Sequence, residues 1–441
     1  MLFALLLAAS SLSRGEEKQP RAKFLVDYMD EHDKIGVFAD AELATFEELR
    51  GSAVALHPTV SEDAWSMSCF WGEAVEGGLE TETAALTAAA HKRMFLVPEY
   101  QRCAEWRYRS LLSTVHGFLY PMFPAGRGFA SLEQRVDMLR EHVSLRSGDV
   151  VVATYPKCGT TLVEQIVLLL LNGGNESSLH PLSRNHHSRM VGGEVVKYWP
   201  EDDLGVSLSL EAFESDPRRR VIKTHAPIEL TIGLGAGNNT ENKEEGETRL
   251  MIAEGVRVIY VTRNPFDAAV SMYHHARREF NFRGPIEEWV RMTVEGTVEF
   301  GSWFEHTASW WRAANIWGGA EGGQQQRRDV LWLHYENIVG DPIAAVTSIA
   351  DFLDIESDGS RAELIQRVAQ ASAFDTMKRS AERDYNELVE RYGAEQVPGT
   401  PSHFRKGKVG GWRDDLGEDE IRRLRHAFDG HLAMYGLDYS Y

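Results

Sequence analysis

The sequence predicts an α/β protein in which a parallel sheet is flanked by helices. Four short apolar segments have the composition of strands, and helical segments or long loops separate them. Cationic and polar side chains follow these segments, at the strand ends where α/β sheets bind ligands. With 441 residues, 43% of them hydrophobic, the chain is long enough to bury a large core.

The first of these segments lies within 149–171, DVVVATYPKCGTTLVEQIVLLLL. Its three valines suit a strand that is covered on both faces, and Pro156 marks the turn that ends it. The apolar run from Leu162 predicts a buried helix. Such a helix, starting at Gly159 or Thr160, directs unpaired N–H groups and the positive end of its dipole toward the turn.

This turn has the chemistry of a phosphate or sulfate site. Lys157 and the hydroxyls of Thr160 and Thr161 stand where the helix favours an anion. A Walker A sequence is excluded, because it needs Gly-Lys-Ser/Thr in that order and here Lys157 comes before Gly159. Without the rest of the chain, a purely structural turn is the alternative.

The other three apolar segments are RRVIKTH (219–225), VRVIYVTR (256–263) and DVLWLHYE (329–336). Lys223 and His225 are two positions apart on a strand, so their side chains face the same side. A histidine with a pKa near neutrality can take a proton from a hydroxyl or an amine. Considered alone, His225 could equally be a hydrogen-bonded core residue.

Two more segments carry cations. After Arg263, Asn264 is a good N-cap and Pro265 a good first helical residue, so a helix should begin there and carry Ser271. In 403–412, HFRKGKVGGW, cations alternate with glycines that let backbone amides approach an anion. An ion pair on the surface is the alternative for Arg263, and a solvated loop is the alternative for 403–412.

Together these motifs resemble the cytosolic-type sulfotransferases, which use 3′-phosphoadenosine 5′-phosphosulfate. TYPKCGTTL resembles their 5′-phosphosulfate loop, and RNPFDAAVS and RKGKVGGW resemble their 3′-phosphate site. GSWFEH with Trp310-Trp311, and HYENIVGDP, match further blocks in the same order. The resemblance covers about three quarters of the chain and implies a P-loop-like sulfotransferase fold.

The resemblance implies transfer of a sulfuryl group from that donor to a hydroxyl or amine of a small-molecule acceptor, without a metal. It makes His225 the general base, while Lys157 and Lys223 stabilise the transferring group and the leaving phosphate. The implied donor-binding residues are Lys157, Cys158, Gly159, Thr160, Thr161, Leu162, Arg263, Ser271, Tyr335, Phe374, Arg405, Lys406 and Gly407.

One position departs from the family pattern. Leu162 stands where relatives usually have a Trp that stacks on adenine, and stacking on a base is worth about 1–3 kcal/mol, so we expect weaker donor binding. A short Lys-Thr-Val-Glu dimer motif is not clear near the C-terminus, which leaves the oligomeric state open. The functional alternatives are a nucleotide or small-molecule kinase with an atypical phosphate loop, and an inactive nucleotide-binding scaffold.

We expect two regions along the chain. We expect residues 1–110 to form a mainly helical N-terminal extension, in which 1–14 are either a targeting segment or a frayed end. We expect residues 111–441 to form the sulfotransferase domain. Polar, Gly-rich stretches predict loop insertions near 172–195, 233–248 and 318–329.

Composition excludes some classes of partner and compartment. The net charge of −19 argues against a nucleic-acid-binding surface, which needs a basic footprint. Three scattered cysteines favour a reducing compartment, so we expect a cytoplasmic protein, although secretory or organellar targeting by the apolar N-terminus stays open. That N-terminal run is too short to span a bilayer, and no stable membrane insertion is expected.

Overall fold

The structure is a computed structural model that describes residues 104–435 with gaps. Outside the described residues lie 1–103, 106–107, 122, 124–125, 127, 177–193, 207, 235–251, 281, 318–323, 327, 357–359, 393–403 and 436–441. Most of the expected N-terminal extension, including 1–14, therefore lies outside the described residues, as do large parts of the three expected insertions.

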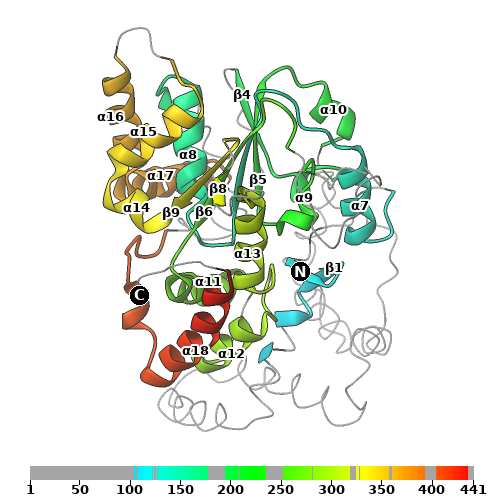
Figure 1. Ribbon diagram of the computed structural model, residues 1–441, viewed down its shortest axis with the longest axis vertical. Helices are drawn as coiled ribbons and strands as arrows, with labels where there is room; N and C mark the ends of the chain where they lie inside the picture. The colour runs from blue at the N-terminus through cyan, green and yellow to red at the C-terminus, as the bar shows by residue number, and fades with distance from the viewer. Residues whose placement is uncertain are drawn as a thin grey trace. The chain divides into compact units, whose positions relative to one another are not determined.

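A parallel sheet forms the centre of the described part and confirms the predicted α/β class (Figure 1). Across its five described strands the order is β4 (Val195–Tyr198), β5 (Arg219–Thr224), β3 (Val150–Thr154), β6 (Arg257–Thr262) and β9 (Val330–His334). All neighbouring pairs are parallel. Every residue of β3 is buried, as its valines predict for a central strand.

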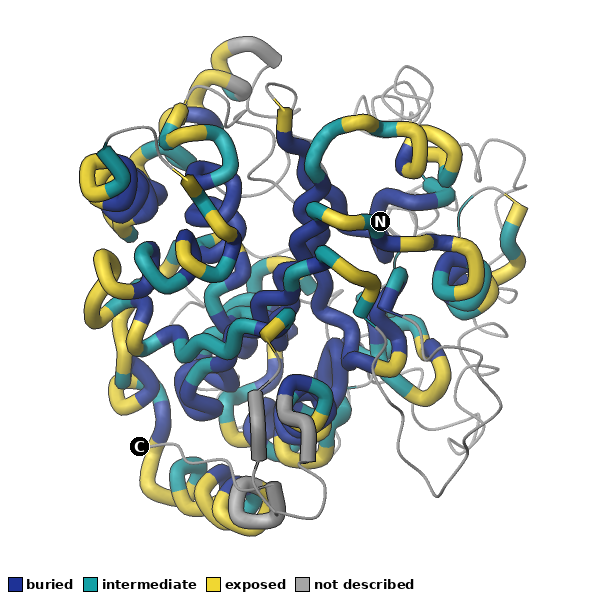
Figure 2. Tube along the Cα trace, turned by 45° about the horizontal axis from the view of Figure 1, so that its top comes forward, coloured by how far each residue is buried: buried dark blue, intermediate teal, exposed yellow. Residues whose placement is uncertain are grey.

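Helices cover both faces of the sheet. On one face, a hydrophobic cluster joins it to α8 (Thr160–Leu171), α14 (Tyr335–Gly340), α15 (Pro342–Phe352) and α16 (Arg361–Ala371). On the other face, a second cluster joins it to α7 (Leu132–His142), α10 (Leu210–Glu214) and α13 (Trp303–Ala314). Figure 2 shows buried residues as a dark-blue band through the middle of the described part, although the edge strand β9 is buried only at Val330.

A third, aromatic-rich cluster lies beyond the carboxyl ends of the strands. It is built from α11 (Pro265–Glu279), α12 (Ile286–Glu295), α18 (Glu418–Tyr435) and the hairpin of β1 (Leu112–Val115) and β2 (Phe118–Pro121). Tyr108 is buried in it and packs edge-on against Trp289. This cluster supports the loops that carry the polar residues.

The structure contains strands where loops were expected. β4 begins at Val195, the last residue assigned to the first insertion, and β8 (Gln324–Gln326) lies within the third and pairs with β7 (Asn315–Trp317). These segments are three or four residues long, too short for a clear alternating pattern. None of the helices in the described part combines the length and the hydropathy that a membrane span requires.

Candidate active site

The loop between β3 and α8 forms the first part of the site. Lys157 and Gly159 have left-handed backbone conformations, with φ of 64° and 106°, and α8 begins at Thr160 without a side-chain cap at Gly159. A Cβ at Gly159 would lie 2.7 Å from Cδ2 of Tyr335, so both the conformation and the space require glycine. The first N–H groups of α8 have no partner within the helix and can bind an anion.

Arg263, at the end of β6, joins this loop to Tyr335. Its Nη1 donates to the backbone oxygen of Lys157 at 2.9 Å, and its guanidinium lies 4.4 Å from the centre of the Tyr335 ring. Its Nε is buried and has no hydrogen-bond partner among the described residues. Arg263 thus contacts the Tyr335 ring and the backbone of Lys157, while the convergence of the Lys157 side chain on the same place stays a prediction.

His225 follows β5 and is held by β3. Its Nδ1 lies 2.9 Å from the backbone oxygen of Thr154, an acceptor, so Nδ1 carries the proton and donates it. Oγ1 of Thr154 lies 3.2 Å from the same nitrogen and 2.6 Å from Oγ1 of Thr160, which connects the histidine to the phosphate-type loop. Nε2 makes no hydrogen bond to any described residue, so its lone pair is available to accept a proton.

Burial keeps His225 neutral. It is 8% exposed, and burial lowers its pKa well below the ordinary value. The positive charges of Lys223 and, more weakly, Lys157 lower this pKa further. The expected pKa near neutrality is therefore too high, but the neutral imidazole that results is the form that can act as a base.

Lys223 is buried, whereas Lys157 is half-buried. Nζ of Lys223, a residue only 5% exposed, lies 3.4 Å from the ring centre of Trp199, which also packs edge-on against His225 at 5.6 Å. Lys223 and His225 thus share one neighbour, as their spacing predicted. Burial lowers the pKa of both Lys157 and Lys223 to about 8, and a bound anion would raise it again.

The C-terminal loop is fixed to the start of α11. Asn264 caps this helix as predicted, by accepting from the N–H of Phe266. Asp267 accepts from the N–H of Gly410 at 2.7 Å and from that of Trp412 at 3.0 Å. The Trp412 ring packs on Phe266. The segment that contains the predicted cations is therefore anchored close behind Arg263.

Within this loop Gly407 lies against Phe374, because a Cβ at Gly407 would overlap the Phe374 ring. Arg405 and Lys406 are exposed and pair with acidic residues of the loop that follows. Nη1 of Arg405 lies 3.3 Å from Asp415, and Nζ of Lys406 lies 3.0 Å from Asp414. Their contact with a donor phosphate stays a prediction.

Four other predicted residues lie in the loop between β3 and α8, at the start of α8, or on α11. The Cys158 thiol faces the core, where burial raises its pKa to about 12, and its N–H donates to the oxygen of Tyr155. Thr161 is exposed at the first turn of α8, and Leu162 is half-buried beside the cluster that contains Tyr335. Ser271 is half-buried on α11. Any contact of these side chains with a donor also stays a prediction.

Sequence reasoning missed several supporting residues. Thr154 ends a run of buried residues and gives no signal of its hydrogen bonds to His225 and Thr160. Asp267 is a favourable charge near a helix start, and nothing in the sequence indicates that it also holds the C-terminal loop. Phe300, whose ring centre lies 5.3 Å from that of His225, belongs to no motif.

A parallel sheet with a phosphate-type loop, a neutral histidine and cations at its carboxyl ends defines an α/β enzyme that transfers a group from an anionic donor. The model of the sulfotransferase domain matches residues 147–233 and 247–436. Sulfotransferase 1B1 from Mus musculus is 31% identical over 311 residues, which are 70% of this chain and 87% of the relative. The chain belongs to the sulfotransferase family.

Other similarities agree with this assignment. Sulfotransferase 1E1 from Mus musculus is 26% identical over 324 residues, or 72% of this chain and 94% of the relative. The structure of mouse sulfotransferase SULT7A1 complexed with PAP has a TM-score of 0.50 at 21% identity, covering 73% of this chain and 95% of that one. Retinol dehydratase in complex with androsterone and inactive cofactor PAP has a TM-score of 0.53 at 20% identity, with 78% and 96% covered.

Proposed function

We propose that this sulfotransferase uses 3′-phosphoadenosine 5′-phosphosulfate as donor, and that His225 is its general base. The observation that carries the proposal is the hydrogen bond from Nδ1 of His225 to the Thr154 oxygen, which leaves Nε2 as the proton acceptor beside the phosphate-type loop. Two solved structures with the same fold are complexes with PAP, the donor without its sulfuryl group. Family membership favours this activity over the kinase alternative.

In the proposed reaction the acceptor oxygen attacks the donor sulfur while Nε2 of His225 takes the acceptor's proton. A bond forms between that oxygen and sulfur, and the bond from sulfur to the 5′-phosphate breaks with its electron pair staying on the phosphate. Lys157, Lys223 and the first N–H groups of α8 stabilise the negative charge that develops there. The products are a sulfate ester and 3′-phosphoadenosine 5′-phosphate.

The donor's 3′-phosphate is proposed to bind beside Arg263, whose buried Nε has no partner among the described residues. Ser271, Arg405, Lys406 and Gly407 would complete that end, with the loop closing over the phosphate. Tyr335 and Phe374 are proposed to pack on the adenine. The support is geometric, since Arg263 contacts Tyr335 and Gly407 contacts Phe374.

The acceptor is proposed to be a small apolar molecule with a hydroxyl group. Aromatic rings surround His225: Trp199 and Phe300 contact it, Phe123 packs edge-on against Trp199, and Tyr120 packs against Phe300. Such walls favour a ring or a chain over a charged or highly hydrated acceptor. Androsterone and retinol, which are present in two structures of retinol dehydratase, are of this kind.

The test is a screen of phenols, sterols, alcohols and amines for acceptor-dependent release of 3′-phosphoadenosine 5′-phosphate. We expect His225→Ala to lower kcat at least a hundredfold, in the range of general-base catalysis. His142→Ala, an exposed histidine on α7, is the matched control and should keep full activity. Unchanged turnover in His225→Ala would remove the proposed base. Phosphoryl transfer from ATP with Mg²⁺, and no sulfuryl transfer, would favour the kinase.

Domain extent and compartment are also proposed. We propose that the expected domain, 111–441, extends back to Ala104, because Ala104 and Tyr108 are buried in the aromatic-rich cluster. We place the protein in the cytoplasm, which fits its membership of the sulfotransferase family. Expression of a chain without residues 1–103 tests the first proposal, because the activity should survive that deletion. Cell fractionation tests the second, and light scattering measures the oligomeric state.

A further inference from the structure

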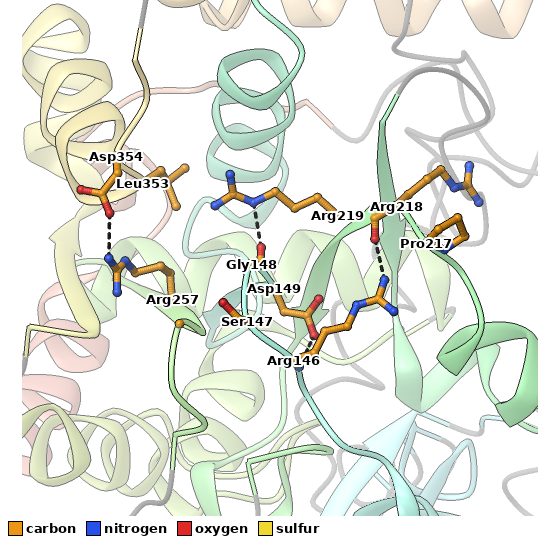
Figure 3. A pocket seen from close by; sticks show the side chains of 11 residues that line it. Arg146, Ser147, Gly148, Asp149, Pro217, Arg218, Arg219, Arg257, Leu353 and Asp354 are labelled. Carbon is orange, nitrogen blue, oxygen red and sulfur yellow. Dashed lines mark hydrogen bonds and ion pairs between the residues drawn. The ribbon is translucent and has the colours of Figure 1, made fainter.

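A second polar site lies at the opposite end of the sheet. A pocket of about 550 Å³ is formed where β3, β5 and β6 begin (Figure 3). Arg219 begins β5 and Arg257 begins β6. His225 is six residues after Arg219, which is about 20 Å along an extended chain at 3.3 Å per residue. The pocket is therefore separate from the candidate active site.

Positive charge is in excess at this pocket. Five arginines and three carboxylates line it or pair with a residue that does: Arg146, Arg218, Arg219, Arg220, Arg257, Asp149, Asp216 and Asp354. Each carboxylate already pairs with one arginine, namely Asp149 with Arg220, Asp216 with Arg218 and Asp354 with Arg257. The charges of Arg146 and Arg219 remain, in a protein whose net charge is −19.

Arg219 has donors to spare. Its Nε donates to the oxygen of Gly148 at 2.7 Å, and the structure gives its two Nη groups no partner among the described residues. Figure 3 shows this guanidinium next to Gly148, on the side of Arg257 and Asp354. Burial and then the charge of Arg257 lower the pKa of Arg219, and the nearby Asp149 and Asp354 offset this only in part.

The backbone at this place is open to a ligand. Gly148 has a φ of 93°, and a Cβ there would meet nothing within 4 Å. Ser147 lines the same pocket, and its hydroxyl forms no hydrogen bond with another described residue. Arg146, by contrast, donates to the backbone oxygens of Glu214, Asp216 and Arg218, so it contributes charge rather than free donors.

We propose that this pocket binds a phosphate monoester, with Arg219 and Arg257 gripping the phosphate and Ser147 donating a further hydrogen bond. Guanidinium groups bind phosphate oxygens with paired, charge-assisted hydrogen bonds. The net excess of two positive charges, which come from Arg146 and Arg219 because Arg257 is paired with Asp354, matches a dianion better than a carboxylate. The volume is that of a small-molecule site, with room for the organic part of the ester beside the phosphate.

The test uses the full chain saturated with 3′-phosphoadenosine 5′-phosphate, so that the candidate active site is filled. Calorimetry then measures the binding of glucose 6-phosphate, inorganic phosphate and acetate. We expect glucose 6-phosphate to bind, acetate not to bind, and Arg219→Gln and Arg257→Gln each to weaken binding at least tenfold. Arg422→Gln, an exposed arginine on α18, is the matched control and should bind as the unaltered protein does.

Two further outcomes have defined meanings. Equal affinity for inorganic phosphate would identify the free ion as the ligand of the same cations. Absence of binding, or binding that Arg219→Gln and Arg257→Gln leave unchanged, would overturn the proposal. A Lys157→Gln variant separates the two sites, because it should weaken binding of 3′-phosphoadenosine 5′-phosphate and leave binding of glucose 6-phosphate intact. Thermal unfolding of each variant shows that it is folded.

Discussion

The charge states of three side chains set the pH range in which the site can work. His225 is neutral because burial and then Lys223 lower its pKa, and Lys157 and Lys223 have a pKa of about 8 because burial lowers it. Both lysines therefore lose their charge as the pH rises through about 8 in the free enzyme, whereas His225 stays a base far below pH 6.5. The site should favour donor binding between these limits.

We predict that kcat/KM for the donor is flat from about pH 6 to about pH 7 and falls as the pH rises through about 8, where both lysines lose their charge. The limb for kcat should lie at higher pH, because the bound donor's negative charge raises the pKa of both lysines. Steady-state pH profiles in a constant-ionic-strength buffer measure both limbs. An acid limb at pH 6.5 in kcat/KM would show that His225 titrates as an ordinary histidine, contrary to its buried position.

Leu162 gives the second prediction at this scale. It is half-buried next to the cluster that contains Tyr335, and the family pattern predicts at this position a Trp that stacks on adenine. A stacked aromatic ring is worth about 1–3 kcal/mol, so Leu162→Trp should tighten binding of 3′-phosphoadenosine 5′-phosphate between fivefold and a hundredfold. Calorimetry measures the gain. Leu171→Trp, at the far end of the same helix, is the control. If Leu162→Trp does not tighten binding, the adenine does not lie beside residue 162.

Individual site residues could be predicted where their role is local. Lys157 and Arg263 follow buried strands directly, so strand prediction alone brings them to one edge of the sheet. Trp199 and Thr154 could not be predicted in the same way. Their contacts with His225 depend on packing between segments that are 26 and 71 residues from it in sequence. The local sequence pattern contains no information about contacts between segments so far apart in the chain.

Among the elements, the joint between α11 and the C-terminal loop has the clearest consequence. Both carboxylate oxygens of Asp267, a residue 3% exposed, accept backbone N–H groups of that loop. Asp267→Asn replaces one oxygen by an N–H₂ group that faces a donor. A buried donor without an acceptor costs about 1–3 kcal/mol.

We therefore expect Asp267→Asn to lower the free energy of unfolding by about 2 kcal/mol. It should also weaken binding of 3′-phosphoadenosine 5′-phosphate, because the segment with Arg405 and Lys406 is released. Urea denaturation and calorimetry measure the two effects. Asp419→Asn, an exposed residue at the start of α18, should change neither. A destabilised variant with unaltered affinity would mean that this loop does not contribute to the donor site.

Elements were predictable where one segment contains the whole signal. The strand, turn and helix around Lys157 are contiguous, and the cap at Asn264 lies directly before its helix, so both were predicted within a residue or two. β4 is an edge strand of four residues, and its place in the sheet depends on pairing with β5, which lies some 20 residues further along the chain. Short strands of this kind become visible only in the folded molecule.

At the scale of the whole molecule, the order of the strands explains why the two polar sites lie apart. β5 and β6 flank β3, so the residues after these strands gather at one edge and those before them at the other. The carboxyl edge carries His225, Lys157 and Arg263, and the amino edge carries the arginine pocket. Because the sheet is parallel, one set of three strands positions both.

Cys158 lies in the aromatic-rich cluster and is fully buried. Its thiol is fully buried in the cluster that unites the hairpin, α11, α12, α13 and α18, and its raised pKa keeps it protonated. Thiol reagents attack the deprotonated, accessible sulfur, so alkylation here must wait until those elements separate. In a variant whose other cysteines are replaced by serine, the rate of Cys158 alkylation would measure how often these packed elements open.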